Sequence, residues 1–145
     1  MARASAWSRD PVQGSGYEAH EKSIFARFST MLLNEGTLDG TQVLRPDTAR
    51  RARSNMLPPG ITAPIGSAGT QVSHDVGYGA GMSVALTEQG KRFRAVGTVS
   101  HGGAAGTLWI ADPTRRATMV FMAQHMPPSR AAACDLATAI EADLR

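Results

Sequence analysis

The residues best suited to chemistry lie in a glycine-rich segment, residues 100–106 with the sequence SHGGAAG, between two apolar stretches. His101 offers an imidazole that can donate or accept a proton near neutral pH. The small residues after it allow a ligand or another segment to approach the backbone closely. Ser100 and His101 cannot act together as nucleophile and base, because adjacent strand residues point to opposite faces. The segment therefore predicts either a ligand-contacting backbone or a tight turn between strands.

The other residues that could take part in catalysis or metal binding are isolated from one another in the sequence. His20, His74 and His125 lack a second histidine at metal-binding spacing, so we expect no metal site. Cys134 adjoins a predicted apolar helix face, which favours a buried structural thiol over a nucleophile. The alternating glycines of residues 77–81 are not followed by a helix, as a dinucleotide fingerprint requires. We expect no cofactor.

The elements that would position the 100–106 segment follow from hydrophobic spacing. Apolar residues at helical spacing predict a helix from Ser23 that ends near Gly36, and Pro46 opens a short helix to about residue 53. Residues 54–75 have the composition of a long loop. Four segments are predicted as strands, residues 77–86, 93–100, 105–111 and 117–123.

The connections between these strands are too short for crossover helices, so the strands should pair antiparallel as a meander. A closing helix follows, and one apolar stripe on it should cover a face of the sheet. Its members are Ala133, Leu136, Ala137, Ile140 and Leu144. The predicted fold class is α+β, with three to four strands and flanking helices.

A collinear series of motifs resembles the penicillin-binding and class C β-lactamase-related serine hydrolases, the esterase-like members most closely. The series runs from about residue 24 to 126 and comprises 25–36 (FARFSTMLLNEG), 38–40 (LDG), 43–48 (VLRPDT), 77–81 (GYGAG), 101–107 (HGGAAGT) and 112–113 (DP). The resemblance implies a partial β-lactamase/transpeptidase-like fold and acyl transfer or hydrolysis of an ester, amide or lactam.

The resemblance also implies site residues. His101-Gly102-Gly103 resembles the Lys-Thr-Gly-like triad that family members carry on an edge strand lining the active site. The residue after that triad lends its backbone N–H to the oxyanion hole, which assigns that role to Ala104. His101 would then be a hydrogen-bond donor that helps to position the substrate.

The sequence departs from the family pattern at the catalytic motifs. Neither lysine, Lys22 or Lys91, follows a serine by three positions, and neither Tyr17 nor Tyr78 begins a Tyr-x-Asn motif. No catalytic set is complete, so we interpret residues 23–145 as the C-terminal portion of such an enzyme and expect the isolated chain to be inactive. Residues 1–22 are predicted to be irregular and foreign to the family, from a frameshift or an alternative start.

Partner and compartment expectations follow from charge and composition. The 145 residues carry a net charge of +3 from scattered basic residues, which disfavours a nucleic-acid partner, and no apolar run suits a membrane helix. Without a signal sequence the default location is cytoplasmic, although full-length relatives include periplasmic or secreted proteins. Beyond a small substrate, residues 118–122 should leave an apolar strand edge open to a complementing fragment or a second copy. The alternative function is a noncatalytic binding or assembly module that uses this edge or the 54–75 loop.

Overall fold

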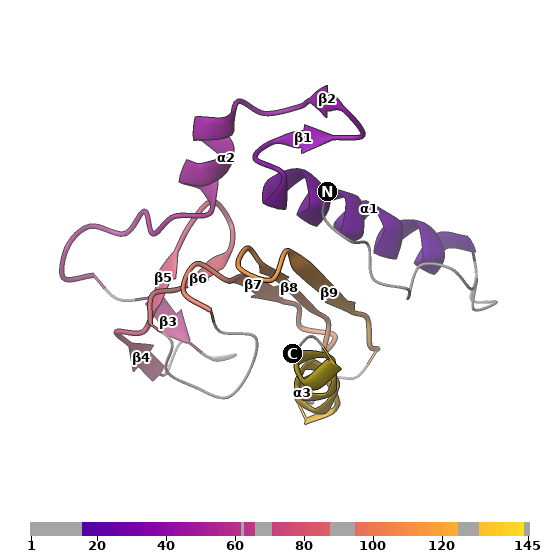
Figure 1. The fold of residues 1–145 in the computed structure, drawn as a ribbon. Helices are drawn as coiled ribbons and strands as arrows, with labels where there is room; N and C mark the ends of the chain where they lie inside the picture. The colour runs from indigo at the N-terminus through magenta and orange to yellow at the C-terminus, as the bar shows by residue number, and fades with distance from the viewer. Residues whose placement is uncertain (1–15, 62, 66–70, 88–94, 125–130, 144–145) are drawn as a thin grey trace.

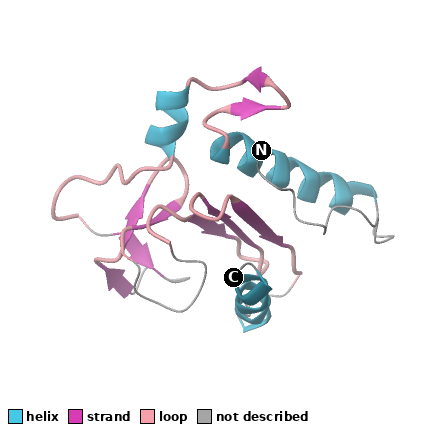
Figure 2. Ribbon diagram, viewed as in Figure 1, coloured by secondary structure: helices cyan, strands magenta, loops and turns pink. Residues whose placement is uncertain are grey.

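The computed structural model describes residues 16–61, 63–65, 71–87, 95–124 and 131–143. These residues form an α+β fold in which a five-stranded antiparallel sheet lies between helices (Figures 1 and 2). In chain order the elements are α1 (Gly16–Leu33), β1 (Thr37–Leu38), β2 (Thr41–Gln42), α2 (Pro46–Ala52), β3 (Ala63–Ile65), β4 (Gln71–Ser73), β5 (Val76–Tyr78), β6 (Ser83–Ala85), β7 (Val99–Gly102), β8 (Leu108–Asp112), β9 (Ala117–Phe121) and α3 (Ala131–Asp143).

The main sheet has the strand order β5-β6-β7-β8-β9, and every neighbouring pair is antiparallel. The predicted meander is confirmed, but the predicted count of three to four strands is wrong. Residues 77–86 do not form one strand, because the chain reverses between β5 and β6. Gly81 has a φ of +77° there, and a side chain on Gly79 would collide with the backbone oxygen of Ala52.

Strand boundaries differ elsewhere too. β7 begins only at Val99, since the chain turns at Gly97 with a φ of +86°. The predicted loop 54–75 contains the β3–β4 hairpin, and the turn between the first two helices contains the short β1–β2 pair. These two hairpins are two-stranded sheets that do not share a ladder with the main sheet.

Alternation along β8 builds two apolar layers. Trp109 and Ala111 belong to a buried cluster with residues of α1, including Leu32. Ile110 points the other way and belongs to a second cluster with Met119 of β9 and residues of α3. The sheet is therefore covered by α1 on one face and by α3 on the other (Figure 1).

Helix α1 begins at Gly16, so residues 16–22 are helical and the prediction that they are irregular is wrong. The helix ends at Leu33, close to Gly36 as the sequence predicted. The Gly36 N–H donates to the Met31 oxygen at 2.8 Å and the Glu35 N–H to the Leu32 oxygen at 3.3 Å, the pattern of a Schellman motif. Glu35 takes the left-handed conformation at φ 53°, and Gly36 follows at φ 89°.

The two remaining helices match the sequence prediction closely. α2 has Pro46 in its first turn and is exposed except at Ala49. On α3, Leu136, Ala137 and Ile140 pack against the sheet, which confirms the predicted stripe. Leu144 lies outside the described residues, as does the side chain of Cys134. Among the described helices, none has the length and apolar character to cross a bilayer.

Candidate functional site

The C-terminal end of β7 carries the residues that the sequence singled out. His101 lies opposite Trp109 of β8, and Gly102 lies opposite Leu108. The chain then turns tightly, with the Gly103 N–H donating to the Thr107 oxygen at 3.0 Å and the Gly106 N–H to the Gly103 oxygen at 3.1 Å. The predicted tight turn between strands is confirmed, and the turn is exposed; the ligand-contacting backbone stays a prediction.

The strand geometry separates Ser100 from His101. His101 shares the α1 face of the sheet with its partner Trp109, whereas Ser100 lies opposite Ile110 on the α3 face. A local nucleophile–base pair is therefore absent, as predicted. His101 is exposed, and no described residue forms a hydrogen bond or ion pair with its side chain.

The expectation that this triad lies on an edge strand is wrong for the described sheet, because β7 is the central strand. The β6–β7 ladder nevertheless ends at the Ser83–Ser100 pair. His101 and Gly102 therefore extend beyond β6 and pair only with β8. The C-terminal end of β7 therefore has no strand partner on one side, because β6 is short.

The backbone N–H of Ala104 is the candidate hydrogen-bond donor to a ligand at this end of β7. Ala104 is exposed, and no described residue accepts a hydrogen bond from its N–H group. The residue before it lies close to Thr107, because a side chain on Gly103 would meet the Thr107 hydroxyl, which would have to rotate away. A side chain on Gly102 would meet its nearest atom, the Thr107 oxygen, at an ordinary 3.5 Å. An exposed N–H without a described acceptor can hold a negatively charged oxygen.

Metal ligation finds no support in the described part of the chain, which contains no cluster of three or more His, Cys, Asp or Glu side chains. His74 and His101 are described and stand apart. The side chain of His20 and the whole of His125 lie outside the description.

A polar recess that the sequence did not predict lies where α1, the β1–β2 hairpin and α2 meet. It has a volume of about 440 Å³, and its lining includes Asn34, Glu35, Gln42 and Arg116. Arg116 follows the far end of β8, so this recess and His101 lie at opposite ends of that strand. The Arg116 guanidinium donates to the Asn34 side-chain oxygen at 2.7 Å.

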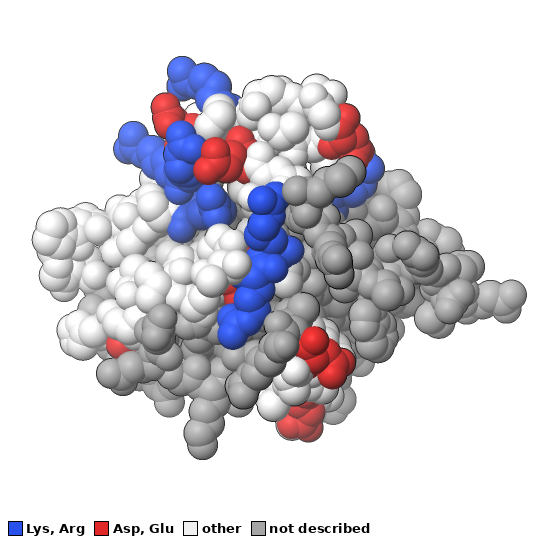
Figure 3. Space-filling model, in the orientation of Figure 1, with Lys and Arg blue, Asp and Glu red and all other residues white. Residues whose placement is uncertain are grey.

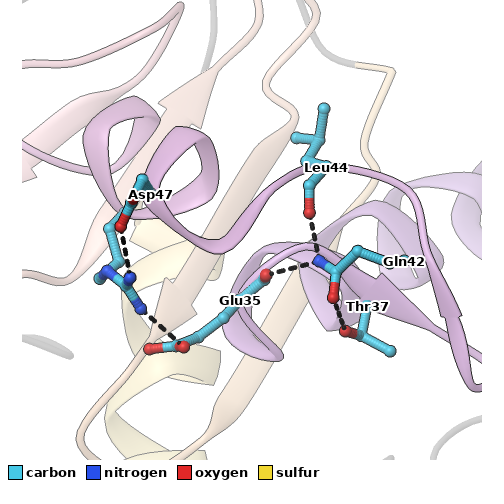
Figure 4. Close-up of polar contacts among 6 residues, drawn as sticks. Glu35, Thr37, Gln42, Leu44 and Asp47 are labelled. Carbon is cyan, nitrogen blue, oxygen red and sulfur yellow. Dashed lines mark hydrogen bonds and ion pairs between the residues drawn. The ribbon is translucent and has the colours of Figure 1, made fainter.

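The contacts at this recess tie three elements together (Figure 4). Arg50 of α2 bridges the Asp47 carboxylate at 2.6 Å and the Glu35 carboxylate at 2.7 Å. The hydrogen bond to Asp47, and then the one to Glu35, raise the pKa of Arg50 above its usual value, so the guanidinium stays charged. Gln42 accepts from the Thr37 hydroxyl and donates to the backbone oxygens of Glu35 and Leu44. The polar groups in this cluster are hydrogen-bonded or ion-paired to one another, which indicates that the cluster has a structural role.

Charge on the visible face is mixed. Basic side chains gather over α2 and along a line down the middle of the view, with acidic side chains among those over α2 (Figure 3). The Arg27–Asp39 and Arg115–Asp112 ion pairs, both within 2.8 Å, also neutralise basic residues.

Comparison with known proteins adds a family context. A family model described as "Beta-lactamase" matches residues 23–143. Two curated proteins of Mycobacterium tuberculosis are similar, "Uncharacterized protein MT1414" of strain CDC 1551 / Oshkosh and "Protein Rv1367c" of strain ATCC 25618 / H37Rv. Each is 31% identical over 116 residues, which cover 71% of this chain and 26% of the relative. The chain therefore spans about a quarter of the length of these relatives.

Solved structures share the fold. A penicillin-binding protein homolog from Caulobacter crescentus matches with a TM-score of 0.52 and 22% identity, over 69% of this chain and 24% of that one. The simvastatin synthase LovD from Aspergillus terreus matches with a TM-score of 0.59 and 18% identity, over 85% of this chain and 31% of that one. At these identities the matches establish a partial β-lactamase/transpeptidase fold.

Proposed function

Because the chain belongs to the β-lactamase family, we propose that the end of β7 forms one wall of an acyl-transfer site for an ester, amide or lactam. The observation that carries this proposal is the N–H of the exposed residue Ala104, which has no described acceptor and lies in the tight turn after β7. A site for acyl transfer needs such a donor, since the tetrahedral intermediate concentrates negative charge on the former carbonyl oxygen.

The proposed roles divide between backbone and side chain. A nucleophilic hydroxyl adds to the substrate carbonyl, and the Ala104 N–H holds the resulting oxyanion. The bond to the leaving group then breaks, and the leaving group takes the proton that the hydroxyl lost to a base. His101, exposed on the same strand end, donates a hydrogen bond to a polar group of the substrate and so orients it.

The nucleophile and base of this reaction come from outside the 145 residues, because no Ser-x-x-Lys or Tyr-x-Asn motif is present in the sequence. We expect the chain alone to bind substrate-like anions weakly and to turn nothing over. In this proposal the chain supplies one wall of a serine-hydrolase-like site, and the catalytic step depends on further polypeptide.

Two measurements test the proposal. The purified chain is incubated with an activated short-chain ester, a chromogenic cephalosporin and a fluorophosphonate probe, and we expect neither hydrolysis nor labelling. Labelling of a defined serine would contradict the assignment of the nucleophile to other polypeptide.

The wall itself is tested by NMR titration with a short-chain carboxylate as oxyanion mimic. The amide resonances of Ala104 and its neighbours should shift on titration. The Ala104→Pro variant removes the N–H and should abolish the shifts, whereas Ala104→Ser keeps it and should preserve them. Equal responses in the two variants would contradict an oxyanion-binding role.

A further inference from the structure

A second recess, with a volume of about 330 Å³, lies between α2 and the turn that joins β5 to β6. Small-molecule sites have volumes of about 300–1,000 Å³, so this recess is large enough for a small ligand. Three apolar residues line it, Ala52 at the end of α2, Met56 after that helix and Ala80 in the turn. Because methionine is flexible and adapts to a bound apolar group, the recess offers a ligand a small apolar surface.

Two arginines line the same recess, Arg45 just before α2 and Arg51 in its last turn. Both are exposed, and neither forms an ion pair with a described residue. The acidic residue in the lining is Asp47, whose carboxylate is paired with Arg50 at 2.6 Å. Among the described residues, Arg45 and Arg51 are therefore uncompensated charges beside an apolar surface. A guanidinium can hold a carboxylate through two parallel hydrogen bonds.

The backbone beside this recess is already paired within the chain, whereas β9 has no described strand on its outer side. The Tyr78 N–H donates to the Asn55 side-chain oxygen at 3.1 Å, and the Met56 N–H donates to the Tyr78 oxygen at 2.8 Å. The Ala80 N–H donates to the Ala52 oxygen at 2.9 Å. Tyr78 therefore has no free backbone group with which a strand of further polypeptide could pair.

The surface of α2 around the recess is charged rather than apolar. Only Ala49 of this helix is buried, and basic side chains with acidic ones among them gather over it (Figure 3). By contrast, the exposed face of α1 holds Ile24, Phe25 and Phe28. Further polypeptide is expected to cover an apolar face such as that of α1, because burying unpaired arginines costs their hydration. This contrast favours a recess on α2 that stays open to solvent.

We propose that this recess binds a small molecule that carries one carboxylate on an apolar body of a few carbons. Arg45 and Arg51 hold the carboxylate, and the apolar body lies on Met56, Ala52 and Ala80. An acidic side chain of further polypeptide would pair with the arginines but would leave Met56, which is 50% exposed, without an apolar neighbour. The arginines and the apolar surface together therefore specify an amphipathic ligand.

NMR titration of the full chain with sodium hexanoate tests the proposal. We expect the amide resonances of Ala52 and Ala80 to shift along a saturating curve. Three comparison ligands each lack one feature: hexanamide lacks the charge, acetate lacks the apolar body, and glutamate capped as its N-acetyl α-amide presents a carboxylate as polypeptide does. Each should bind at least about tenfold more weakly than hexanoate, since each loses either the charged or the apolar contact.

Substitutions in the lining separate the two kinds of contact. Arg45→Gln and Arg51→Gln should each weaken hexanoate binding about tenfold, because each removes a charge-assisted hydrogen bond. Arg27→Gln is the matched control, since it removes an exposed arginine outside the recess, and it should leave binding unchanged. Met56→Ala should weaken hexanoate binding several-fold and leave acetate binding unchanged. Circular dichroism confirms that each variant folds.

The Ala104→Pro variant keeps this test independent of the proposed acyl-transfer wall. It should abolish the carboxylate-induced shifts around residue 104 and leave those at Ala80 intact, and loss of the Ala80 shifts would overturn the proposal. Unchanged hexanoate binding in both arginine variants would overturn it too, as would the absence of saturable shifts at Ala80. Binding of capped glutamate as tight as that of hexanoate would identify an acidic side chain as the occupant and so contradict a small-molecule site.

Discussion

Two threonines with contrasting surroundings show how much a buried hydroxyl contributes. The Thr98 side-chain oxygen is buried without a hydrogen-bond partner among the described residues, whereas the Thr118 hydroxyl donates to the Ile110 oxygen at 3.0 Å. Valine has nearly the same shape but no hydroxyl. We expect Thr98→Val to leave the free energy of unfolding unchanged or raise it by about 1 kcal/mol, since an unsatisfied buried group costs stability.

Thr118→Val is the matched control, and it should lower the free energy of unfolding by about 1 kcal/mol because a hydrogen bond is lost. Urea unfolding followed by circular dichroism measures both variants, under conditions where the chain has one oligomeric state. Equal losses in the two variants would mean that Thr98 has a partner that the described contacts do not include.

Contacts between individual residues were the features that the sequence predicted least well. The pattern of residues 100–106 located the turn, but it could not show that Gly103 lies close to Thr107 or that the Ala104 N–H lacks a described acceptor. Arg50 of α2 pairs with Glu35, which follows α1, and no local spacing predicts an ion pair between residues fifteen positions apart. Such contacts depend on how helices and turns dock, so they become visible only with the fold.

At the scale of elements, the junction between α1 and the β1–β2 hairpin depends on one close approach. Gly36 and Gly40 both have strongly positive φ values, 89° and 80°. A side chain on Gly36 would collide with the Leu44 backbone oxygen, whereas a side chain on Gly40 would meet nothing within 4 Å. We expect Gly40→Ala to cost about 1 kcal/mol from backbone strain alone.

Gly36→Ala should cost about 2 kcal/mol more than Gly40→Ala, because the collision is with backbone that cannot rotate away. The comparison isolates crowding from strain, since the two glycines share the same conformation. Thermal unfolding of the pair gives the difference. If both variants lost the same stability, the hairpin would be able to move away from the end of α1.

The same scale shows where periodicity predicts well and where it fails. The stripe on α3 follows directly from one apolar face against the sheet, and it was predicted. The prediction of one strand over residues 77–86 failed because Gly79 and Gly81 form the turn of a hairpin. On α1 the helical spacing of Ile24, Phe25 and Phe28 was right, yet the face stays exposed because the sheet ends at β9.

At the scale of the whole molecule, one sheet separates two apolar layers. Leu32 is almost fully buried in the layer under α1, and Ile140 packs in the layer under α3. No member is shared between the two clusters. Among the described residues, the fold therefore has two separate apolar clusters on opposite faces of one sheet.

This separation predicts additive core mutations. Leu32→Val deletes a methylene from a buried side chain and Ile140→Val deletes one from a partly buried side chain, and each should lower the free energy of unfolding by about 1 kcal/mol. Because the sites share no neighbour, the double variant should equal the sum within about 0.5 kcal/mol. As a positive control for coupling, Leu32→Val combined with a second α1-layer change, Val84→Ala, should depart from additivity.

Strong coupling between Leu32 and Ile140 would instead mean that a packing change on one face of the sheet is transmitted to the other. The sheet would then act as a shared core between the helices, and a partner bound at α1 would influence α3.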